Sequence, residues 1–358
     1  MPWGWGNWAR RRRPLHISWN PPSGRDWFRA IEGRFFRITV ITIFAMPKPF
    51  HGHIEIIQRN AIQSWMRLDP GVEVILFGDE HGTAGVCKEF GLRHVPHVGR
   101  SEFGAPLLNT VFEGAQRVSK HNPLVYVNCD ILLFHDFREA LKATTARRER
   151  FLMVGRRWDL DITTPLDFSD SSLEMTLRDQ AIRNGLQRAE MWIDYFVFPR
   201  NLYDDIPPLA IGRRYWDNWL IWKARNIHAD VVDATPSVVA IHQNHDYSHH
   251  PQGAKGVLQS PESERNFTLA GGWKHLFTLK DANYHLCRDT LQPSRSYWFA
   301  PAGRQFSRGW DKVRGVTRVH FWHPLLDATR PIRHAVGLRR AKDQLPKKKP
   351  VGGHEFDR

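Results

Sequence analysis

A carboxylate and an amide follow an apolar stretch in the middle of the chain. Residues 124–133 read Leu-Val-Tyr-Val-Asn-Cys-Asp-Ile-Leu-Leu, so Asn128 and Asp130 stand two residues apart. On an extended chain such side chains share a face, and a carboxylate among apolar residues is costly unless it is paired or bound to a metal. Oxygen ligands suit Mg²⁺ or Mn²⁺, which often hold substrate phosphates. The alternative is an Asx turn that closes a strand.

A second cluster with metal-binding chemistry lies downstream. His242, His245 and His249 fall within one eight-residue segment, beside Asn244, Asp246 and Tyr247. Tetrahedral zinc is conceivable, but no cysteine is nearby. The cluster is therefore a candidate for metal binding, and the alternative is a polar group of residues on the surface.

Two further acids stand among apolar residues. Asp217, in Trp-Asp-Asn-Trp, is expected at the start of a helix that runs to Ala224. It is either an N-cap or a catalytic carboxylate that takes a proton from a substrate. The helix dipole would lower its pKa, whereas the flanking tryptophans would raise it by desolvation. Asp194 interrupts the apolar strand of Trp-Ile-Asp-Tyr-Phe-Val-Phe, and it is either a buried structural acid or an acceptor-binding one.

Alternating strands and helices must position these residues. Apolar and β-branched runs predict strands, and apolar residues at helical spacing predict helices between them. This alternation over about 100 residues predicts an α/β fold with a mostly parallel sheet. The strands are expected at 37–45, 72–77, 92–95, 124–127 and 151–155, and the helices at 53–68, 86–90 and 106–119, the last with Pro106 in its first turn.

Open parallel sheets bind ligands beyond the carboxyl ends of their strands. Thr42 and its neighbours, the segment Gly78-Asp79-Glu80 and the segment Asn128-Cys129-Asp130 lie at such ends. Two of these three segments present a carboxylate. The sequence therefore predicts a ligand site at this edge of the sheet.

These segments together resemble the nucleotide-sugar-dependent glycosyltransferases of the GT-A fold, in a bacterial branch similar to family 2. The resemblance runs from residue 38 to about residue 270. It covers Thr-Ile-Phe (42–44), Phe-Gly-Asp (77–79), Phe-Gly-Ala-Pro-Leu-Leu-Asn (103–109), Val-Asn-Cys-Asp-Ile (127–131), Trp-Asp-Asn-Trp (216–219) and the histidine segment 242–249. The spacing of Asn128 and Asp130 resembles the Asp-x-Asp motif of the family. Asn128 departs from that motif, so Asp130 is left as the strong metal ligand.

The resemblance implies roles for individual residues. A late histidine often completes the metal site, and we choose His242 first and His245 second. Asp217 is similar to the acid that inverting enzymes place at a helix start. Residues expected on the nucleotide side are Thr42 and Asp79 at the base or ribose, Asn109 and Asn128 nearby, and Lys255 at the diphosphate. Arg156, Arg157, Trp158 and Asp159 are expected to frame the sugar pocket, and Asn109 and Lys255 have the plain alternatives of a capping and a solvated residue.

The charge distribution decides which partners to expect. The chain has 358 residues, 41% hydrophobic and 25% charged, and a formal net charge of +14. Residues 1–37 carry +6 and residues 251–358 carry +11, whereas residues 38–250 carry −3. A core near neutrality argues against nucleic-acid binding. We expect a basic arm (1–37), a GT-A catalytic domain (38–250) and a C-terminal extension (251–358) that ends in a basic flexible tail.

The composition of the N-terminal arm allows two interpretations. It contains Trp3, Trp5, Trp8, Trp19 and Trp27 beside the arginine run 10–13. The arm either folds loosely over the core or binds an anionic membrane surface. The longest apolar run, 38–46, is shorter than the roughly 20 residues of a membrane-spanning helix. With three cysteines and no apolar leader, we expect a cytoplasmic protein, peripheral at the inner membrane face if the arm binds lipid.

The sequence thus predicts a metal-dependent glycosyltransferase. Its donor would be a nucleotide-diphospho-sugar, its cofactor Mn²⁺ or Mg²⁺, and its acceptor a saccharide or lipid-linked hydroxyl compound. One alternative is a sugar-phosphate nucleotidyltransferase, which is disfavoured because segment 45–53 has one glycine where such enzymes have a glycine-rich loop. The other alternative is a non-catalytic nucleic-acid-binding protein, which only the basic ends support.

Overall fold

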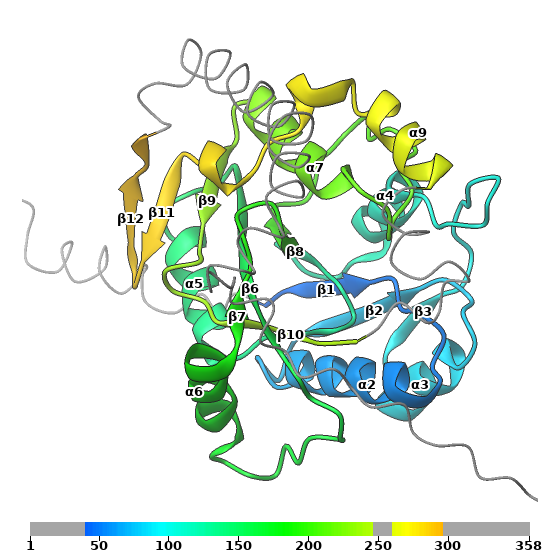
Figure 1. Cartoon of the computed structure of the whole chain (residues 1–358), viewed down its shortest axis with the longest axis vertical. Coiled ribbons are helices and arrows are strands. Elements are labelled where there is room, and N and C mark those ends of the chain that lie inside the picture. The colour runs from blue at the N-terminus through cyan, green and yellow to red at the C-terminus, as the bar shows by residue number, and fades with distance from the viewer. Residues whose placement is uncertain (1–39, 246–259, 296–358) are drawn as a thin grey trace, which may run out of the picture.

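A computed structural model describes residues 40–245 and 260–295. Within this part of the chain, twelve strands form one twisted sheet with the order β12-β11-β9-β6-β8-β4-β1-β2-β3 (Figure 1). Strands β10 and β7 pair with β6, and β5 pairs with β10. Most neighbours along the order are parallel, while β8 is antiparallel to both β4 and β6. The predicted α/β class and mostly parallel sheet are confirmed.

The first half of the described chain follows the predicted alternation. Helix α3 ends at Gly91, whose φ of 66° is the left-handed conformation expected of a glycine cap. Pro106 lies before helix α4 and pairs with Arg100 in an isolated bridge, so its expected place in the first turn is wrong. The elements are β1 (Thr42–Ala45), α2 (Gly52–Met66), β2 (Glu73–Phe77), α3 (Thr83–Phe90), β3 (Arg93–Val95), α4 (Leu108–Val118) and β4 (Leu124–Val127).

The second half adds strands on the other side of β4. Its elements are β5 (Ile131–Leu132), α5 (His135–Thr145), β6 (Phe151–Leu160), α6 (Leu173–Asn184), β7 (Leu186–Gln187), β8 (Ile193–Phe198), α7 (Trp216–Asn226), β9 (Asp230–Asp233), β10 (Ala240–Gln243), α9 (Pro261–Leu269), the short 3₁₀ helices η1 (Gly272–His275) and η2 (Leu279–Asp281), β11 (Tyr284–Cys287) and β12 (Thr290–Pro293). Strand β11, which lies beyond the boundary expected at residue 250, is parallel to β9 and extends the main sheet.

Helices cover both faces of the sheet, and each face has its own apolar core. Neighbouring strand residues point to opposite faces, so Phe44 packs beneath α4 and α7 while Ile43 packs against α2 and α5. Figure 1 shows α2 and α3 on one side of the sheet and α4, α7 and α9 on the other. With both faces covered, the open carboxyl edge of the central strands is the place where polar side chains can gather.

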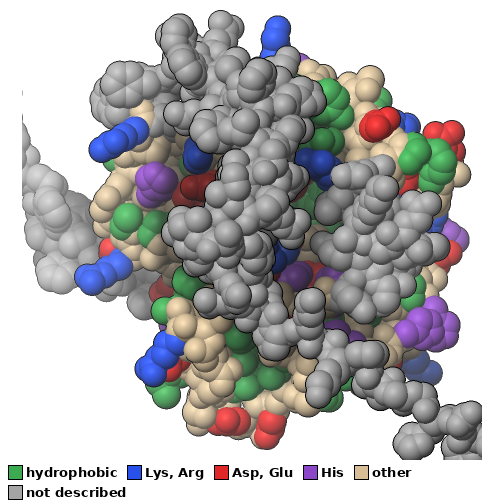
Figure 2. All heavy atoms as spheres, in the orientation of Figure 1, with side chains coloured by type: hydrophobic (Ala, Val, Ile, Leu, Met, Phe, Trp, Pro, Cys, Tyr) green, Lys and Arg blue, Asp and Glu red, His purple; other side chains and the backbone are tan. Residues whose placement is uncertain are grey.

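The pairing of β10 brings the downstream histidines to that edge. His242 on β10 lies opposite Ile131 of β5 and opposite Asp159 of β6. Two segments more than 100 residues apart in the sequence thus meet next to Asp130. On the face drawn in Figure 2, basic and acidic side chains of the described residues are interspersed. Across the described ranges, no helix has the length and apolar character needed to span a bilayer.

Candidate metal and catalytic site

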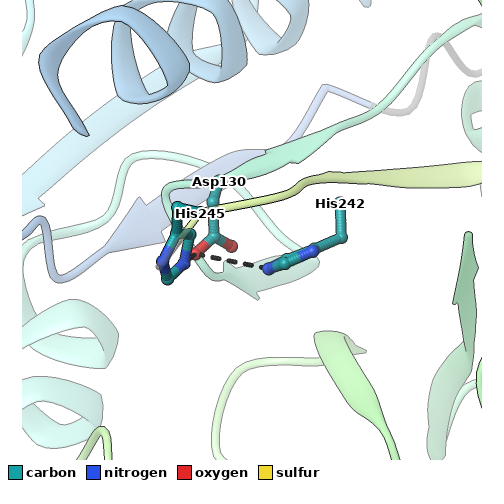
Figure 3. Close-up of side chains that lie close together, drawn as sticks. All are labelled: Asp130, His242 and His245. Carbon is teal, nitrogen blue, oxygen red and sulfur yellow. Dashed lines mark hydrogen bonds and ion pairs between the residues drawn. The ribbon is translucent and has the colours of Figure 1, made fainter. Parts of the chain in front are cut away.

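Asp130, His242 and His245 form a compact group, as Figure 3 shows. One potential ligand atom from each residue lies within 4.8 Å of those of the other two. The Asp130 Oδ2 atom is 3.1 Å from His245 Nε2 and 3.9 Å from His242 Nε2. The two imidazoles approach the same carboxylate from the end of β10, while Asp130 comes from the turn between β4 and β5. The three residues chosen as metal ligands from the sequence are therefore brought together.

The backbone around the group is held by hydrogen bonds. Ile131 N donates to Asn128 O at 3.1 Å, which closes the turn after β4. Gln243 N donates to Asp130 O at 3.0 Å, which ties β10 to that turn. The Gln243 side chain is fully buried and donates to Ile57 O in α2. These contacts fix Asp130 and the β10 histidines relative to each other before any ligand binds.

A second acid orients His242. The Asp159 Oδ1 atom lies 3.3 Å from His242 Nδ1, on the side of the ring away from Asp130. A carboxylate behind a histidine fixes the ring and leaves Nε2 to face a metal ion. Burial alone would raise the pKa of Asp159, but His242, Arg157 and Arg188 lower it to about 2. Asp159 is therefore a carboxylate at neutral pH.

Asp130 is buried in an environment of positive charge. Burial acts to raise its pKa, but Lys48, His242 and His245 together hold the pKa well below its usual range. Its second oxygen, Oδ1, is buried and has no hydrogen-bond partner among the described residues. A buried, ionised carboxylate with an unused oxygen is what a cation ligand requires. The residues present thus fit a divalent cation.

Asn128 points to a neighbouring acid. Its Nδ2 donates to Asp194 Oδ1 at 2.7 Å, and its backbone N donates to Asp194 O at 2.9 Å. Asp194 Oδ2 accepts from Arg157 Nη1 at 2.9 Å, and all the charged atoms of this pair are largely buried. Of the two roles that the sequence left open for Asp194, these contacts match the buried structural acid. Because its carboxylate is already paired with Arg157, the catalytic role predicted for Asp194 is disfavoured.

Asp217 is the acid with the pKa most suited to proton transfer. It is the second residue of α7, next to the buried Trp216. Burial raises its pKa to about 7, the negative charge of Asp194 adds to this effect, and the Asn218 amide opposes it. Burial therefore outweighs the backbone hydrogen bonds at the start of α7, which lower the pKa of Asp217. The charges of Asp194 and Arg157 act on Asp217, and Asp194 is hydrogen-bonded to Asn128, so Asp217 lies near this part of the site.

Helix α9 holds the loop that leads to Asp217. Asn266 is fully buried: its Oδ1 accepts from Ala210 N at 2.8 Å, and its Nδ2 donates to the carbonyls of Ala210 and Arg214, each at 3.0 Å. Glu262 accepts from Arg213 Nε at 2.6 Å and also bonds Ser101. The α9 side chains thus connect the loop before α7 to the loop 99–107 before α4.

Thr42 does not reach the ligand edge, and the role expected for it is wrong. Strand β1 begins at residue 42, not at residue 37, so Thr42 stands at its amino end. Its side chain is fully buried and donates to Glu73 Oε2 at 2.7 Å. The ligand edge is at the carboxyl ends of the parallel strands β1, β2 and β4, beyond Ala45. The physical reason is register: the apolar run in the sequence does not show where strand pairing starts.

The other residues expected on the nucleotide side have mixed outcomes. Asp79 follows β2 at the ligand edge, is exposed, and accepts from Arg100 at 2.6 Å, which lowers its pKa. Asn109 lies in the first turn of α4, and its buried Oδ1 has no partner among the described residues. Lys255 and His249 lie outside the described residues. Nucleotide binding by Asp79, Asn109 and Asn128 stays a prediction.

Two residues at the centre of the site were not selected from the sequence. Lys48 contacts Asp130 and His245, and Arg188 contacts Asp159. A weak signal existed for Lys48, because it lies three residues beyond β1, at the same edge as Asp79 and Asp130. Arg188 had none, since it reaches the site through the pairing of β7 with β6.

Comparisons with known proteins give similarity in structure only. No protein-family model matches the sequence, and no curated protein matches it. Among solved structures, the chain is similar to glucosyl-3-phosphoglycerate synthase from Mycobacterium tuberculosis in complex with Mg²⁺ and UDP, at 14% identity and a TM-score of 0.42, over 71% of this chain and 85% of the other. It is also similar to GalNAc-T7 with UDP, GalNAc and Mn²⁺, at 12% identity and a TM-score of 0.42, over 66% and 49%.

A third similar structure is S. aureus TarS, residues 1–349, at 9% identity and a TM-score of 0.39, over 57% of this chain and 60% of the other. At such identities and TM-scores these likenesses carry no argument about substrates or the roles of residues, so function must be inferred from this chain's own site.

Proposed function

We propose that this protein is a metal-dependent glycosyltransferase that moves a sugar from a nucleotide-diphospho-sugar to an acceptor hydroxyl. The observation that carries the proposal is the group Asp130, His242 and His245 at the carboxyl edge of the sheet, in one site with an acid whose pKa is about 7. Such a transfer needs a metal site for the leaving diphosphate and a general base for the acceptor hydroxyl.

Asp130, His242 and His245 would hold the cation. When bound, it would neutralise the charge that develops on the leaving diphosphate. Asp159, 3.3 Å from Nδ1, would pair with the His242 ring and help to orient it. Arg157 forms ion pairs with both Asp159 and Asp194 and so balances their buried negative charges.

Asp217 would accept the proton of the acceptor hydroxyl. A general base works best when its pKa is near the working pH, and the pKa of about 7 meets that condition. The loop before α7, held by Asn266 and Glu262 of α9, sets the position of Asp217. A saccharide or lipid-linked acceptor, as the sequence resemblance implies, is part of the proposal.

The ligand set favours Mn²⁺ over Mg²⁺. Mg²⁺ prefers oxygen ligands, whereas imidazole nitrogen suits the transition metals better. Two of the three candidate ligands are histidines. We therefore expect Mn²⁺ to bind more tightly than Mg²⁺ to the protein alone.

A thermal-shift screen tests the proposal. UDP, GDP, CDP and dTDP are each added with and without Mn²⁺, because a ligand that binds only the folded state raises the melting temperature. At least one nucleotide should stabilise the protein more with Mn²⁺ than without it. Asp130→Ala should abolish this difference, and Asp179→Ala, on the exposed side of α6, is the matched control that should retain it.

The corresponding nucleotide-sugar should then release its nucleoside diphosphate in an Mn²⁺-dependent way. If nucleotide and Mn²⁺ stabilise Asp130→Ala as much as the native protein, the assignment of Asp130 as a metal ligand is contradicted. Stabilisation by all four nucleotides with no turnover of any sugar nucleotide would make the protein a nucleotide-binding module.

A further inference from the structure

Lys48 enters the candidate metal site from the loop after β1. Its Nζ lies 2.9 Å from His245 Nε2 and 3.4 Å from Asp130 Oδ2. The ammonium group therefore contacts two of the three candidate ligands. Among the described residues, no other lysine or arginine is recorded as paired with Asp130.

The backbone of Lys48 is held by two hydrogen bonds, and part of its side chain is exposed. Lys48 N donates to Gln58 Oε1 at 2.6 Å, and Gln58 Nε2 donates back to Lys48 O at 2.9 Å. Gln58 is buried within α2, and Pro47 and Pro49 restrict the chain on either side. The Lys48 side chain keeps 33% of its surface exposed, and its four-carbon stem allows the ammonium to change partners.

The ammonium and a divalent cation would compete at His245 and Asp130. In the tautomer whose Nε2 carries no proton, His245 Nε2 offers one lone pair, and either the Lys48 ammonium or a metal ion takes it. An ion bound to either oxygen of the Asp130 carboxylate would also stand close to the ammonium at Oδ2, and the two positive charges would repel each other. A metal ion that binds here must therefore displace the Lys48 ammonium from its present position.

We propose that Lys48 is a resident cation of the site that competes with the divalent ion for Asp130 and His245 and turns to the diphosphate of the donor when the ion binds. This inference rests on the proposed function. This competition couples the binding of the divalent ion to that of the nucleoside diphosphate. The nucleoside diphosphate offers the displaced ammonium a new partner, so each of the two should strengthen the binding of the other. Coupling between two binding events is reciprocal, and it commonly amounts to a factor of roughly 5 to 150.

The test compares Lys48→Met with the native protein and with Lys88→Met. Lysine 88 is exposed on α3, so its loss removes one charge away from the site. Mn²⁺ alone is titrated by calorimetry. Lys48→Met should bind Mn²⁺ about 5-fold or more tightly than the native protein, whereas Lys88→Met should match the native protein.

Two further measurements follow from the same competition. Without metal, Lys48→Met leaves the buried Asp130 charge less compensated, so its melting temperature should fall and Mn²⁺ should restore it. With saturating Mn²⁺, the nucleoside diphosphate found by the thermal-shift screen should bind Lys48→Met more weakly than the native protein. Lys48→Arg keeps the charge. Its metal-free melting temperature and its affinity for the nucleoside diphosphate should lie between those of Lys48→Met and of the native protein.

The outcomes separate this inference from the proposed function. If Lys48→Met binds Mn²⁺ no more tightly than the native protein does, Lys48 does not compete with the ion and the inference is overturned, while the metal site stands. If neither protein binds Mn²⁺, the metal assignment fails and the inference fails with it.

Discussion

The pKa of Asp217 decides the pH dependence of the proposed reaction. The acid can accept a proton only when ionised, and its pKa is about 7. We expect the rate of transfer at low substrate to rise with pH and level off above about 7. A rate that is flat between pH 5 and 8 would place the base elsewhere.

Asp217→Asn tests the same residue by substitution. Transfer should fall by about 10²-fold or more, the usual scale for a lost general base. Affinity for the donor nucleotide should barely change, because the role belongs to the acceptor. The matched control is Asp204→Asn, an exposed acid paired with Lys223, which should keep native turnover. Native turnover in Asp217→Asn would leave Asp217 as a helix-terminal residue.

Stability gives an independent measurement for the same variant. The folded-state pKa of Asp217 lies above its ordinary value of 3.8, so the folded protein binds the proton more tightly than the unfolded chain does. The contribution of Asp217 to the free energy of unfolding therefore falls as the pH rises from about 4 to about 7. Asp217→Asn lacks this loss, so its stability relative to the native protein should improve across that window in urea denaturation.

At the scale of elements, α9 holds the loop that carries the proposed base. The Asn266 amide makes three hydrogen bonds to the backbone of Ala210 and Arg214. Asn266→Ala leaves those buried groups without partners, which should cost about 1–3 kcal/mol or more of unfolding free energy. Transfer should also fall while donor affinity is kept, since the loop leads to Asp217 and not to Asp130.

The control for this substitution is Thr268→Ala on the same helix. Thr268 is exposed and its side chain donates to Glu264 O within α9, so unfolding free energy and transfer should stay close to native values. If Asn266→Ala loses stability but keeps the native rate of transfer per folded molecule, then α9 supports the fold without positioning Asp217.

At the scale of the whole molecule, the near-neutral core leaves the basic ends to account for the net charge. The N-terminal arm, which lies outside the described residues, is proposed to bind anionic membrane surfaces. Removing residues 1–30 should keep donor hydrolysis and reduce sedimentation with anionic vesicles. The difference should shrink as salt is added, because screening weakens surface electrostatics.

A charge-only variant separates the two parts of this interaction. Replacing the four arginines 10–13 by glutamine keeps the tryptophans and should give intermediate vesicle binding. Equal sedimentation of the full-length and truncated proteins would contradict the membrane proposal and favour an arm that folds on the core.

Much of this protein follows from local sequence pattern. The helices and central strands were predictable because each buries an apolar face whose periodicity is written in consecutive residues. Asp130 could be placed at the ligand edge because the α/β alternation predicts which strand ends share an edge, whereas His242 and His245 were chosen from the resemblance to the GT-A family. The ligand atoms of the three residues lie within 4.8 Å of one another in the structure, and their binding of a metal stays a prediction.

What the tertiary structure decided depends on register and burial, which no local pattern contains. The apolar run at 37–45 could not show that pairing begins at Thr42, which put that residue at the wrong end of its strand. The pKa of Asp217 depends on how deeply α7 is buried beside Asp194. Lys48 meets Asp130 across 82 positions of sequence, a contact that exists only because α2 fixes the loop after β1 over the end of β4.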